Sequence, residues 1–280
     1  MSAISTNVRV RVPPAATTSP LAPLATLARR RFQLTVSRPR ELFVPLVTPI
    51  LFALVIAPAL KTALHTGTAY EAFVATGTIG LLIPLNTMFS GLSVIVDREA
   101  GAQRELLAAP IPRPLLPLGN LVVAVATTAF QVAVLLGIAD VRRIHFHITA
   151  SGFLWFLAAT MLFTVGMYGL AEVLTGRVPK TEEYIARVPA VAIVPWFLAG
   201  SLFSIKALPV GLTWITRFLP LTHGLALVRY GLLDDSSALH DIWGMHSTGA
   251  MAGLSLLVCA LFALALTRAA VRVFGHSAVK

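Results

Sequence analysis

Charged residues are concentrated in the segment DREAGAQRELLAAPIPR, Asp97 to Arg113, which lies between two long apolar runs. Acidic and basic side chains at this density could hold a partner protein through charge-assisted hydrogen bonds, and Leu106 with Leu107 adds an apolar patch. Asp97 is a plausible helix cap, Glu99 suits the first turn, and four prolines from residue 110 onward oppose continuation. The segment therefore predicts a short, sharply terminated helix.

Two interpretations of this helix remain open on physical grounds. It could be an ordinary connection between two apolar runs, or it could be docked against another protein. Its charges are not set at the Glu-to-Lys spacing of four that would stabilise an isolated helix, and this favours docking.

Three polar residues interrupt the apolar runs and could line a path for polar groups: Asn86, Gln131 and Glu172. A carboxylate in lipid is costly and often functional, but Glu172 is close enough in sequence to pair with Arg177 at the membrane interface, which is the simpler interpretation. Proton-driven carriers need ionisable groups near the middle of the membrane, and these runs offer no convincing set. The energy for any transport is therefore expected to come from elsewhere.

Sequence motifs for catalysis or nucleotide binding are absent. The chain contains no GxxxxGK[ST], no HExxH and no GxSxG, so it is not expected to bind a nucleotide through a phosphate loop or to act as an enzyme. His145 and His147 could bind a metal only if His240 or His246 came near, and an interfacial loop is the better interpretation. Cys259 is the single cysteine and is expected to be a packing residue.

Composition identifies a membrane protein. The 280 residues are 56% hydrophobic and 12% charged, with a mean hydropathy of +0.81, whereas soluble domains carry about 25% charged residues. The apolar runs are continuous rather than alternating, which favours spanning helices over a barrel. The net charge of +10 comes largely from basic residues that flank these runs, where they contact anionic lipid rather than nucleic acid.

Six membrane spans are predicted, at residues 42–60, 73–96, 115–138, 153–174, 188–203 and 249–271, within a transmembrane domain of residues 39–273. With a cytoplasmic start, sixteen of the 22 basic residues lie on the inner side and six on the outer side, which places both termini in the cytoplasm. Residues 1–20 lack the apolar core of a secretory signal and are predicted to be a disordered tail, and residues 274–280 form a second tail.

Two further segments are predicted to contact the membrane without crossing it. Residues 21–38 place apolar side chains at helical spacing and predict an interfacial helix that ends near Pro39, although a simple basic topology anchor is also possible. Residues 206–233 are apolar enough to suggest a seventh span, but four residues interrupt the apolar run: Arg217, Pro220, His223 and Arg229. Two short helices broken at Leu219-Pro220 and dipping into the outer leaflet are the better account.

Two segments together resemble the type-2 permeases of ABC exporters, which include daunorubicin-resistance, nodulation-factor and polysaccharide export subunits. The first is YEAFVATGTIGLLIPLNTMFSGLSVIVDREAGAQRELLAAPIPRPLLPLGNLV, whose end is similar to the family's acidic-Arg-Glu-x-Gly, Leu-Leu, Pro-basic pattern. The second is LAGSLFSIKALPVGLTWITRFLPLTHGLALVRYGLL, similar to a fifth span followed by LP…W…PLTH…R. The resemblance runs from about Arg29 to Arg272, and the proline-rich APIPRPLLP departs from it.

The resemblance implies a non-catalytic, bacterial inner-membrane permease that pairs with a second permease copy or paralogue and with two separate ATPase subunits. Those ATPases would bind the ATP and Mg²⁺. The helix after the second span would be a coupling helix seated in the ATPase, helped by the helix before the first span. Carried over, the coupling residues are Asp97, Arg98, Glu99, Gly101, Arg104, Glu105, Leu106, Leu107, Arg30 and Arg31. Among these we expect Arg98, Glu99, Arg104 and Glu105 to grip through charge pairs.

The broken outer segment would correspond to the family's re-entrant helices near the exit of the cargo path. Its marked residues are Pro209, Trp214, Arg217, Pro220, His223 and Arg229. The expected cargo is amphipathic, lipid-like, drug-like or a glycan. A self-contained channel or ion-coupled carrier is the alternative from another class, and a membrane enzyme or scaffold would need a polar active site that the sequence does not offer.

Overall fold

The computed structural model describes residues 21–65, 68–108 and 111–277, and within these ranges every regular element is a helix. Five helical segments are long and apolar enough to cross a membrane: Leu42–Ala63, Ala69–Glu99, Leu115–Val141, Ala150–Arg177 and Thr248–Val273. The predicted all-helical membrane class is thereby confirmed. The predicted disordered tail at residues 1–20 lies outside the described residues, as does the end of the C-terminal tail.

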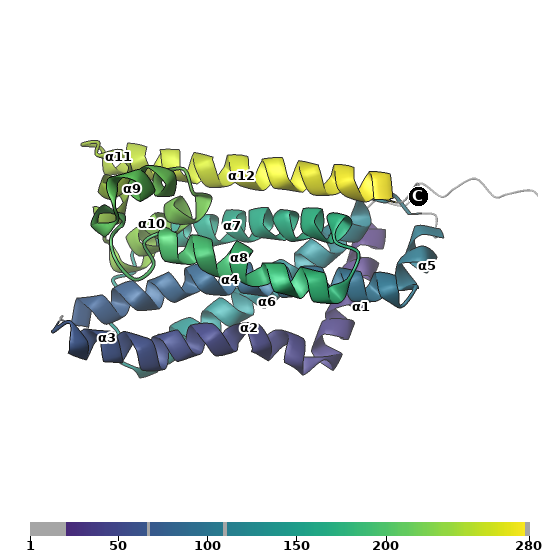
Figure 1. The fold of residues 1–280 in the computed structure, drawn as a ribbon, viewed down its shortest axis with the longest axis horizontal. Helices are drawn as coiled ribbons and strands as arrows, with labels where there is room; N and C mark the ends of the chain where they lie inside the picture. Colours follow the sequence, from purple (N-terminus) through teal and green to yellow (C-terminus); the bar gives the residue numbers. More distant parts are fainter. Residues whose placement is uncertain (1–20, 66–67, 109–110, 278–280) are drawn as a thin grey trace, which may run out of the picture.

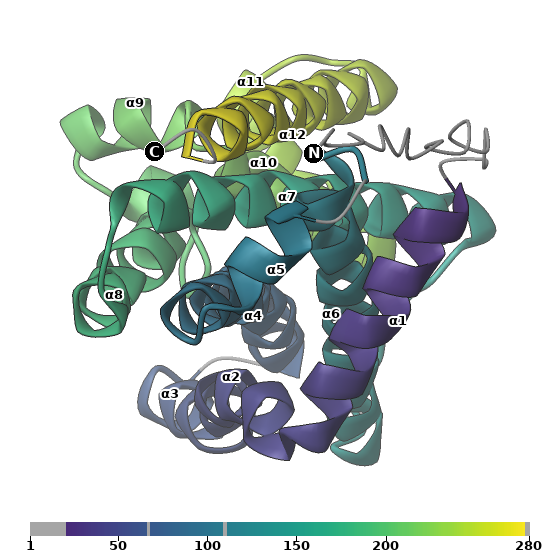
Figure 2. The same ribbon diagram turned by 90° about the vertical axis from the view of Figure 1, so that its right-hand side faces the viewer.

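The chain begins with two helices that meet at a sharp break. Helix α1, Leu21–Ser37, lies across α6 and exposes apolar residues such as Phe32 and Val36 (Figure 2). Helix α2, Pro39–Leu51, starts with the proline that the sequence marked as the end of α1. It continues through a π-helical turn at Phe52–Ile56 into α3, Ala57–Ala63. The first long apolar helical segment is therefore interrupted by a π-bulge between its prolines.

Helix α4, Thr68–Glu99, is the central element of the bundle. It packs against α2, α6, α7 and α8 and is largely buried. A short helix, α5, Ala102–Ala108, follows it, and α6, Leu115–Val141, returns along the bundle. The helix begins at Leu115, the residue at which the sequence predicts the start of the third span, and Pro114 occupies its N-cap position.

Helices α7, Ala150–Arg177, and α12, Thr248–Ser277, form the most extensive helix pair. Their close approach depends on Gly169, where an added Cβ would lie 2.8 Å from the Leu266 backbone. Gly169, one of the small residues expected to allow close helix packing, thus lies between two helices of the same chain.

Helix α8, Thr181–Leu198, corresponds to the fifth predicted span. It is fastened to α4 by Tyr184, whose hydroxyl donates to Met88 O at 3.0 Å, and by Trp196, whose Nε1 donates to Gly77 O at 2.7 Å. The helix has 18 residues and carries Glu182, Glu183 and Arg187 in its first turns, and it is not among the five segments above. It ends at Leu198 instead of continuing to residue 203, because the chain turns at Gly200 with φ +80°.

Short helices gather at one end of the bundle and α5 lies at the other (Figure 1). The short helices are α9, Val210–Arg217, α10, Pro220–Leu233, and α11, Ser237–Trp243. The break between α9 and α10 occurs at Leu219-Pro220, as the sequence predicts. Helix α1 lies at the same end as α5, so the two segments expected to receive an external partner share one face (Figure 2).

Candidate functional site

The C-terminal end of α4 is fastened to the turn between α7 and α8. Arg98 donates from Nη1 to Thr175 O at 2.9 Å and from Nη2 to Val178 O at 2.7 Å and Pro179 O at 3.2 Å. Glu99 accepts from the backbone N of Thr181 at 3.2 Å and from its hydroxyl at 3.1 Å, at the first residue of α8. A carboxylate here satisfies free N–H groups at the start of a helix.

A partly buried ion pair joins the same end of α4 to α1. Arg31 Nη1 lies 3.2 Å from Asp97 Oδ2, and the Arg31 side chain is only 7% exposed. Thr35, the next buried residue of α1, bonds back to its own helix. Helix α1 therefore turns Arg31 and Thr35 toward the bundle together with apolar residues such as Leu27, which packs against Gly119 on α6, while Phe32 and Val36 stay exposed.

These contacts revise the expected helix. Asp97, Arg98 and Glu99 are not the cap and first turn of a separate helix, because α4 continues through Glu99 without a helix breaker. The separate helix begins only at Ala102, after Gly101 adopts φ +79°, a left-handed conformation that glycine enters without strain. The side chains of Arg98 and Glu99 are used within the chain, and Arg31 is buried with Asp97.

Helix α5 keeps the residues that remain available to a partner. Glu105 is exposed, and Leu106 and Leu107 are partly exposed. The side chain of Arg104 and the residues 109–110 lie outside what the structure describes. A small gap separates α5 from α1, lined by Gln103 and Leu106 on one side and by Leu27 and Arg30 on the other.

The polar residues predicted to line a path are buried against neighbouring helices. Asn86 on α4 donates to Thr128 Oγ1 at 2.7 Å and to Thr127 Oγ1 at 3.2 Å, both on α6. Gln131 on α6 donates from Nε2 to Leu42 O at 2.6 Å, and its Oε1 is buried without a partner. Both amides hold helices together in this conformation rather than face an open passage.

Glu172 pairs differently from the expected contact with Arg177. It accepts a hydrogen bond from the hydroxyl of Tyr168, one turn earlier on α7, and both side chains are buried. Arg31 lies within electrostatic reach of this carboxylate. Sequence reasoning missed Tyr168, although its spacing of four residues from Glu172 was a usable signal.

At the opposite end of the bundle, Arg229 on α10 contacts both α4 and the segment that follows α8. Its guanidinium donates from Nη2 to Gly200 O at 2.8 Å and Ser201 O at 3.1 Å, beyond the end of α8. It also lies 3.5 Å from the ring centroid of Phe73 on α4. Arg229 is 2% exposed, so its role in this conformation is to hold this end of the bundle together.

The other marked residues of the outer segment are dispersed. Pro209 precedes α9 and Pro220 is the first residue of α10. Trp214 is exposed, and the guanidinium of Arg217 lies 5.4 Å from the centroid of its ring. His223 is buried between Arg217 O at 2.9 Å and Ser255 Oγ at 3.2 Å, and burial lowers the pKa of its ring.

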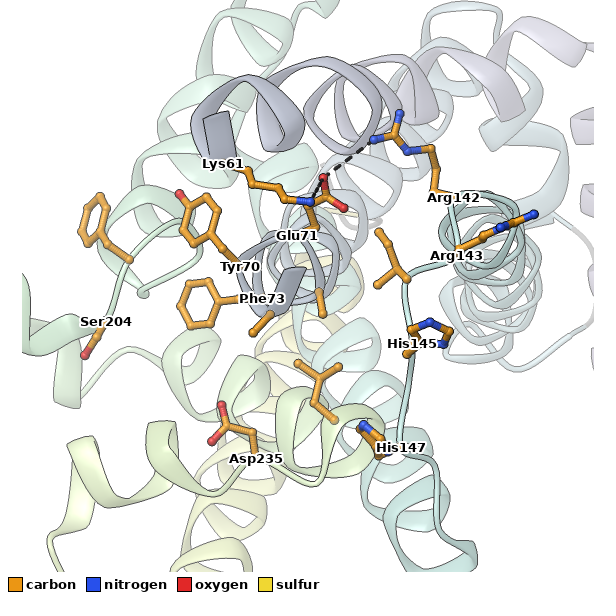
Figure 3. A pocket seen from close by; sticks show the side chains of 15 residues that line it. Lys61, Tyr70, Glu71, Phe73, Arg142, Arg143, His145, His147, Ser204 and Asp235 are labelled. Atoms are coloured by element: carbon orange, nitrogen blue, oxygen red, sulfur yellow. Dashed lines mark ion pairs between the residues drawn. The ribbon is translucent and has the colours of Figure 1, made fainter. Parts of the chain in front are cut away.

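An open cavity of about 990 Å³ lies at the same end of the bundle as Arg229 (Figure 3). Its walls come from the end of α3, the first turns of α4, the loop between α6 and α7, and the segments around Phe203 and Asp235. Glu71 stands between Lys61 at 3.3 Å and Arg142 at 3.9 Å. His145 and His147 line the loop side, but no group of three metal-binding side chains occurs among the described residues.

Comparison with known proteins is consistent with this arrangement. The sequence profile described as ABC-2 type transporter matches residues 23–233. The chain is 25% identical over 242 residues to a putative transport permease, ycf38, of Porphyra purpurea, covering 83% of each chain. It is also 25% identical over 198 residues to the inner membrane transport permease YadH of Escherichia coli K12, covering 68% of this chain and 74% of that one.

A third relative is named as a nodulation protein. Nodulation protein J of Rhizobium leguminosarum bv. viciae is 26% identical over 174 residues, covering 61% of this chain and 66% of its own length. The profile match takes in α1 to α10, including both segments on which the resemblance rests. The chain is a multi-pass, non-catalytic membrane transport subunit and belongs to the ABC-2 type transporter family.

Proposed function

We propose that this chain is the permease of an ATP-driven exporter and that its α5 helix receives force from a separate ATPase subunit that binds ATP and Mg²⁺. The observation that carries the proposal is the fastening of the α4 end. Arg98 and Glu99 join α4 to the turn between α7 and α8, and Asp97 joins it to α1. A push on α5 would thus be passed to four helices at once.

The proposed docking surface consists of α5 and the adjoining part of α1. It offers the Glu105 carboxylate, the partly exposed Leu106 and Leu107, and the half-buried Arg30. Charged rim groups around apolar side chains are the usual composition of a protein interface. The grip through charge therefore falls on Glu105 and Arg30, and on Arg104 if its side chain is also presented.

The proposed topology has six crossings with both termini in the cytoplasm of a bacterial inner membrane. Helix α8 would be the fifth crossing, because its outer face carries the exposed apolar residues Ile185, Val194 and Phe197. Helices α9 and α10 would be the re-entrant pair, since protein covers α10. A second permease, identical or paralogous, would complete a path for an amphipathic, lipid-like, drug-like or glycan cargo.

The proposal is tested by isolating the chain from its native membranes in mild detergent. We expect an ATP-binding cassette subunit in stoichiometric amount, and ATP-dependent cargo export by vesicles that contain both proteins. Glu105→Arg and Leu106→Asp should each remove the ATPase from the complex. Glu183→Arg is the matched control, because Glu183 is exposed on the first turn of α8 at the same end and should leave binding unchanged.

Transport by the purified chain alone, without any ATPase, would contradict the proposal and favour a self-contained channel or ion-coupled carrier. Equal loss of ATPase binding in the Glu183 control would also contradict it, since the effect would then not be specific to α5.

A further inference from the structure

The outer cavity has two chemically different walls. One side of the cavity carries Lys61, Glu71 and Arg142, and the rings of Tyr70 and Phe73 lie beside Glu71 on the first turns of α4 (Figure 3). Tyr70 and Phe73 lie nearly parallel, with ring centroids 6.3 Å apart. We propose that this cavity binds an anionic amphiphile, with its charged head group at Lys61 and Arg142 and its apolar part against the aromatic wall; this rests on the proposed export function and names the class of its cargo.

The charges of the polar wall do not balance. One carboxylate, Glu71, is shared by two cations, at 3.3 Å from Lys61 and 3.9 Å from Arg142. One further carboxylate, Asp235, lines the cavity away from this wall, and Arg143 also contributes to the lining. The wall around Glu71 therefore carries an excess of positive charge, which attracts an anion and repels a cation.

The two ion pairs are exchangeable. The Lys61 side chain is 31% exposed and that of Arg142 is 37% exposed, whereas Glu71 is 14% exposed. Ion pairs with this much solvent contribute little stability, so an incoming phosphate or carboxylate can replace Glu71 as the partner of Arg142. In the absence of a ligand, the Glu71 carboxylate holds the side chains of Lys61 and Arg142 in position.

The aromatic wall is held rigidly from behind. The hydroxyl of Tyr70 donates to Leu202 O at 3.0 Å, and the buried guanidinium of Arg229 lies against the Phe73 ring. Opposite the rings, His147 N donates to Leu232 O at 2.9 Å and fixes the loop between α6 and α7 to α10. A volume of about 990 Å³ between fixed walls is at the upper end of the range for drug-sized ligands. It accommodates a head group together with part of a chain.

The test uses the full-length permease, without an ATPase, in nanodiscs of phosphatidylcholine. Octyl phosphate is titrated calorimetrically, with inorganic phosphate and octyl glucoside as the two half-ligands and empty nanodiscs as the blank. We expect saturable binding of octyl phosphate at least ten-fold tighter than that of either half-ligand. Equal binding of inorganic phosphate would overturn the role of the aromatic wall, and equal binding of octyl glucoside would overturn the role of the cations.

Variants separate the ligand site from a structural ion cluster. Arg142→Gln and Lys61→Gln should each weaken octyl phosphate binding at least five-fold, while Arg142→Lys should keep part of it. Glu71→Gln should tighten binding at least three-fold, because the competing carboxylate is gone; weakening by Glu71→Gln to the level of Arg142→Gln would overturn the proposal. Arg187→Gln, an exposed site on α8, is the control and should bind as the unaltered chain.

A second nanodisc composition tests whether the anionic amphiphile comes from the bilayer or from solution. If bilayer lipid fills the cavity, nanodiscs that contain phosphatidic acid will weaken octyl phosphate binding in the unaltered chain and not further in Arg142→Gln. If the ligand is cargo from solution, phosphatidic acid will have no effect. Failure of octyl phosphate binding leaves the ATPase isolation unaffected, so the two proposals fail separately.

Discussion

Arg31 and Asp97 are 66 residues apart in the chain and form a partly buried ion pair, with Arg31 Nη1 3.2 Å from Asp97 Oδ2. The pair ties α1 to the last turn of α4. Together with the packing of Leu27 and Ala28 on α6, this contact fixes where the helix lies at the end of the bundle.

Breaking that pair should destabilise the protein markedly. Asp97→Asn removes the hydrogen-bonded anion of the buried Arg31 guanidinium and leaves only the Glu172 carboxylate in its electrostatic reach, so we expect a loss of about 1 to 3 kcal/mol. The measurement is thermal unfolding in detergent, with Arg29→Gln as the control because Arg29 is exposed on the same helix. If Asp97→Asn lowers the transition temperature no more than the control does, the ion pair does not stabilise the contact between α1 and α4.

Replacing Arg98 tests transmission rather than docking. Arg98→Lys cannot reach the three carbonyl oxygens of Thr175, Val178 and Pro179 together, since an ammonium lacks the planar fork of a guanidinium. We expect at least a ten-fold loss of transport per ATP hydrolysed with the ATPase still bound. The ratio of export to hydrolysis in vesicles measures this, and an unchanged ratio would contradict a mechanical role for the clamp.

Mild acid should loosen the outer helices through His223. Burial lowers the pKa of this imidazole below the ordinary value of about 6.5, with the Arg217 carbonyl partly opposing the shift. Below pH 6.5 the unfolded chain binds a proton that the folded chain does not, so stability falls as the pH decreases, by at most about 1.4 kcal/mol per pH unit.

The measurement is the unfolding temperature between pH 7.5 and pH 5. His223→Gln should flatten that dependence, while His246→Gln, at an exposed loop residue, should leave it unchanged. A steep dependence that survives His223→Gln would assign the acid sensitivity to another group.

Membrane sidedness can be read with single cysteines, because Cys259 is the one natural cysteine and is buried. In a Cys259→Ala background, His246→Cys should react with a membrane-impermeant maleimide in intact cells. Glu105→Cys should react only after the cells are permeabilised, and the background without added cysteine should not react. Labelling of Glu105→Cys in intact cells would place α5 outside and remove the proposed ATPase contact.

The helices were predictable from the sequence because their signals are local. Continuous apolar runs indicated the long helices, and the break at Pro220 indicated two short helices instead of a seventh span. The end of α1 before Pro39 followed from the restricted conformation of a residue that precedes proline.

The partners of charged residues were not predictable because they lie far apart in sequence. Arg98 resembles an exposed residue of a charged helix, yet its acceptors are about 80 residues away in the turn after α7. The extent of α4 was also misjudged, since Asp97 resembles a helix cap but no breaker precedes Gly101. Glu172 was expected to pair with Arg177, whereas Tyr168 on the same face of α7 is its partner.

Gly101 sets the direction in which α5 leaves the end of α4. Its φ of +79° is one that residues with a Cβ adopt only under strain, although a Cβ there would meet nothing within 4 Å. The glycine is therefore required by the backbone conformation and not by lack of space. Any other residue at this position would favour a different φ and would aim the proposed docking surface away from its partner.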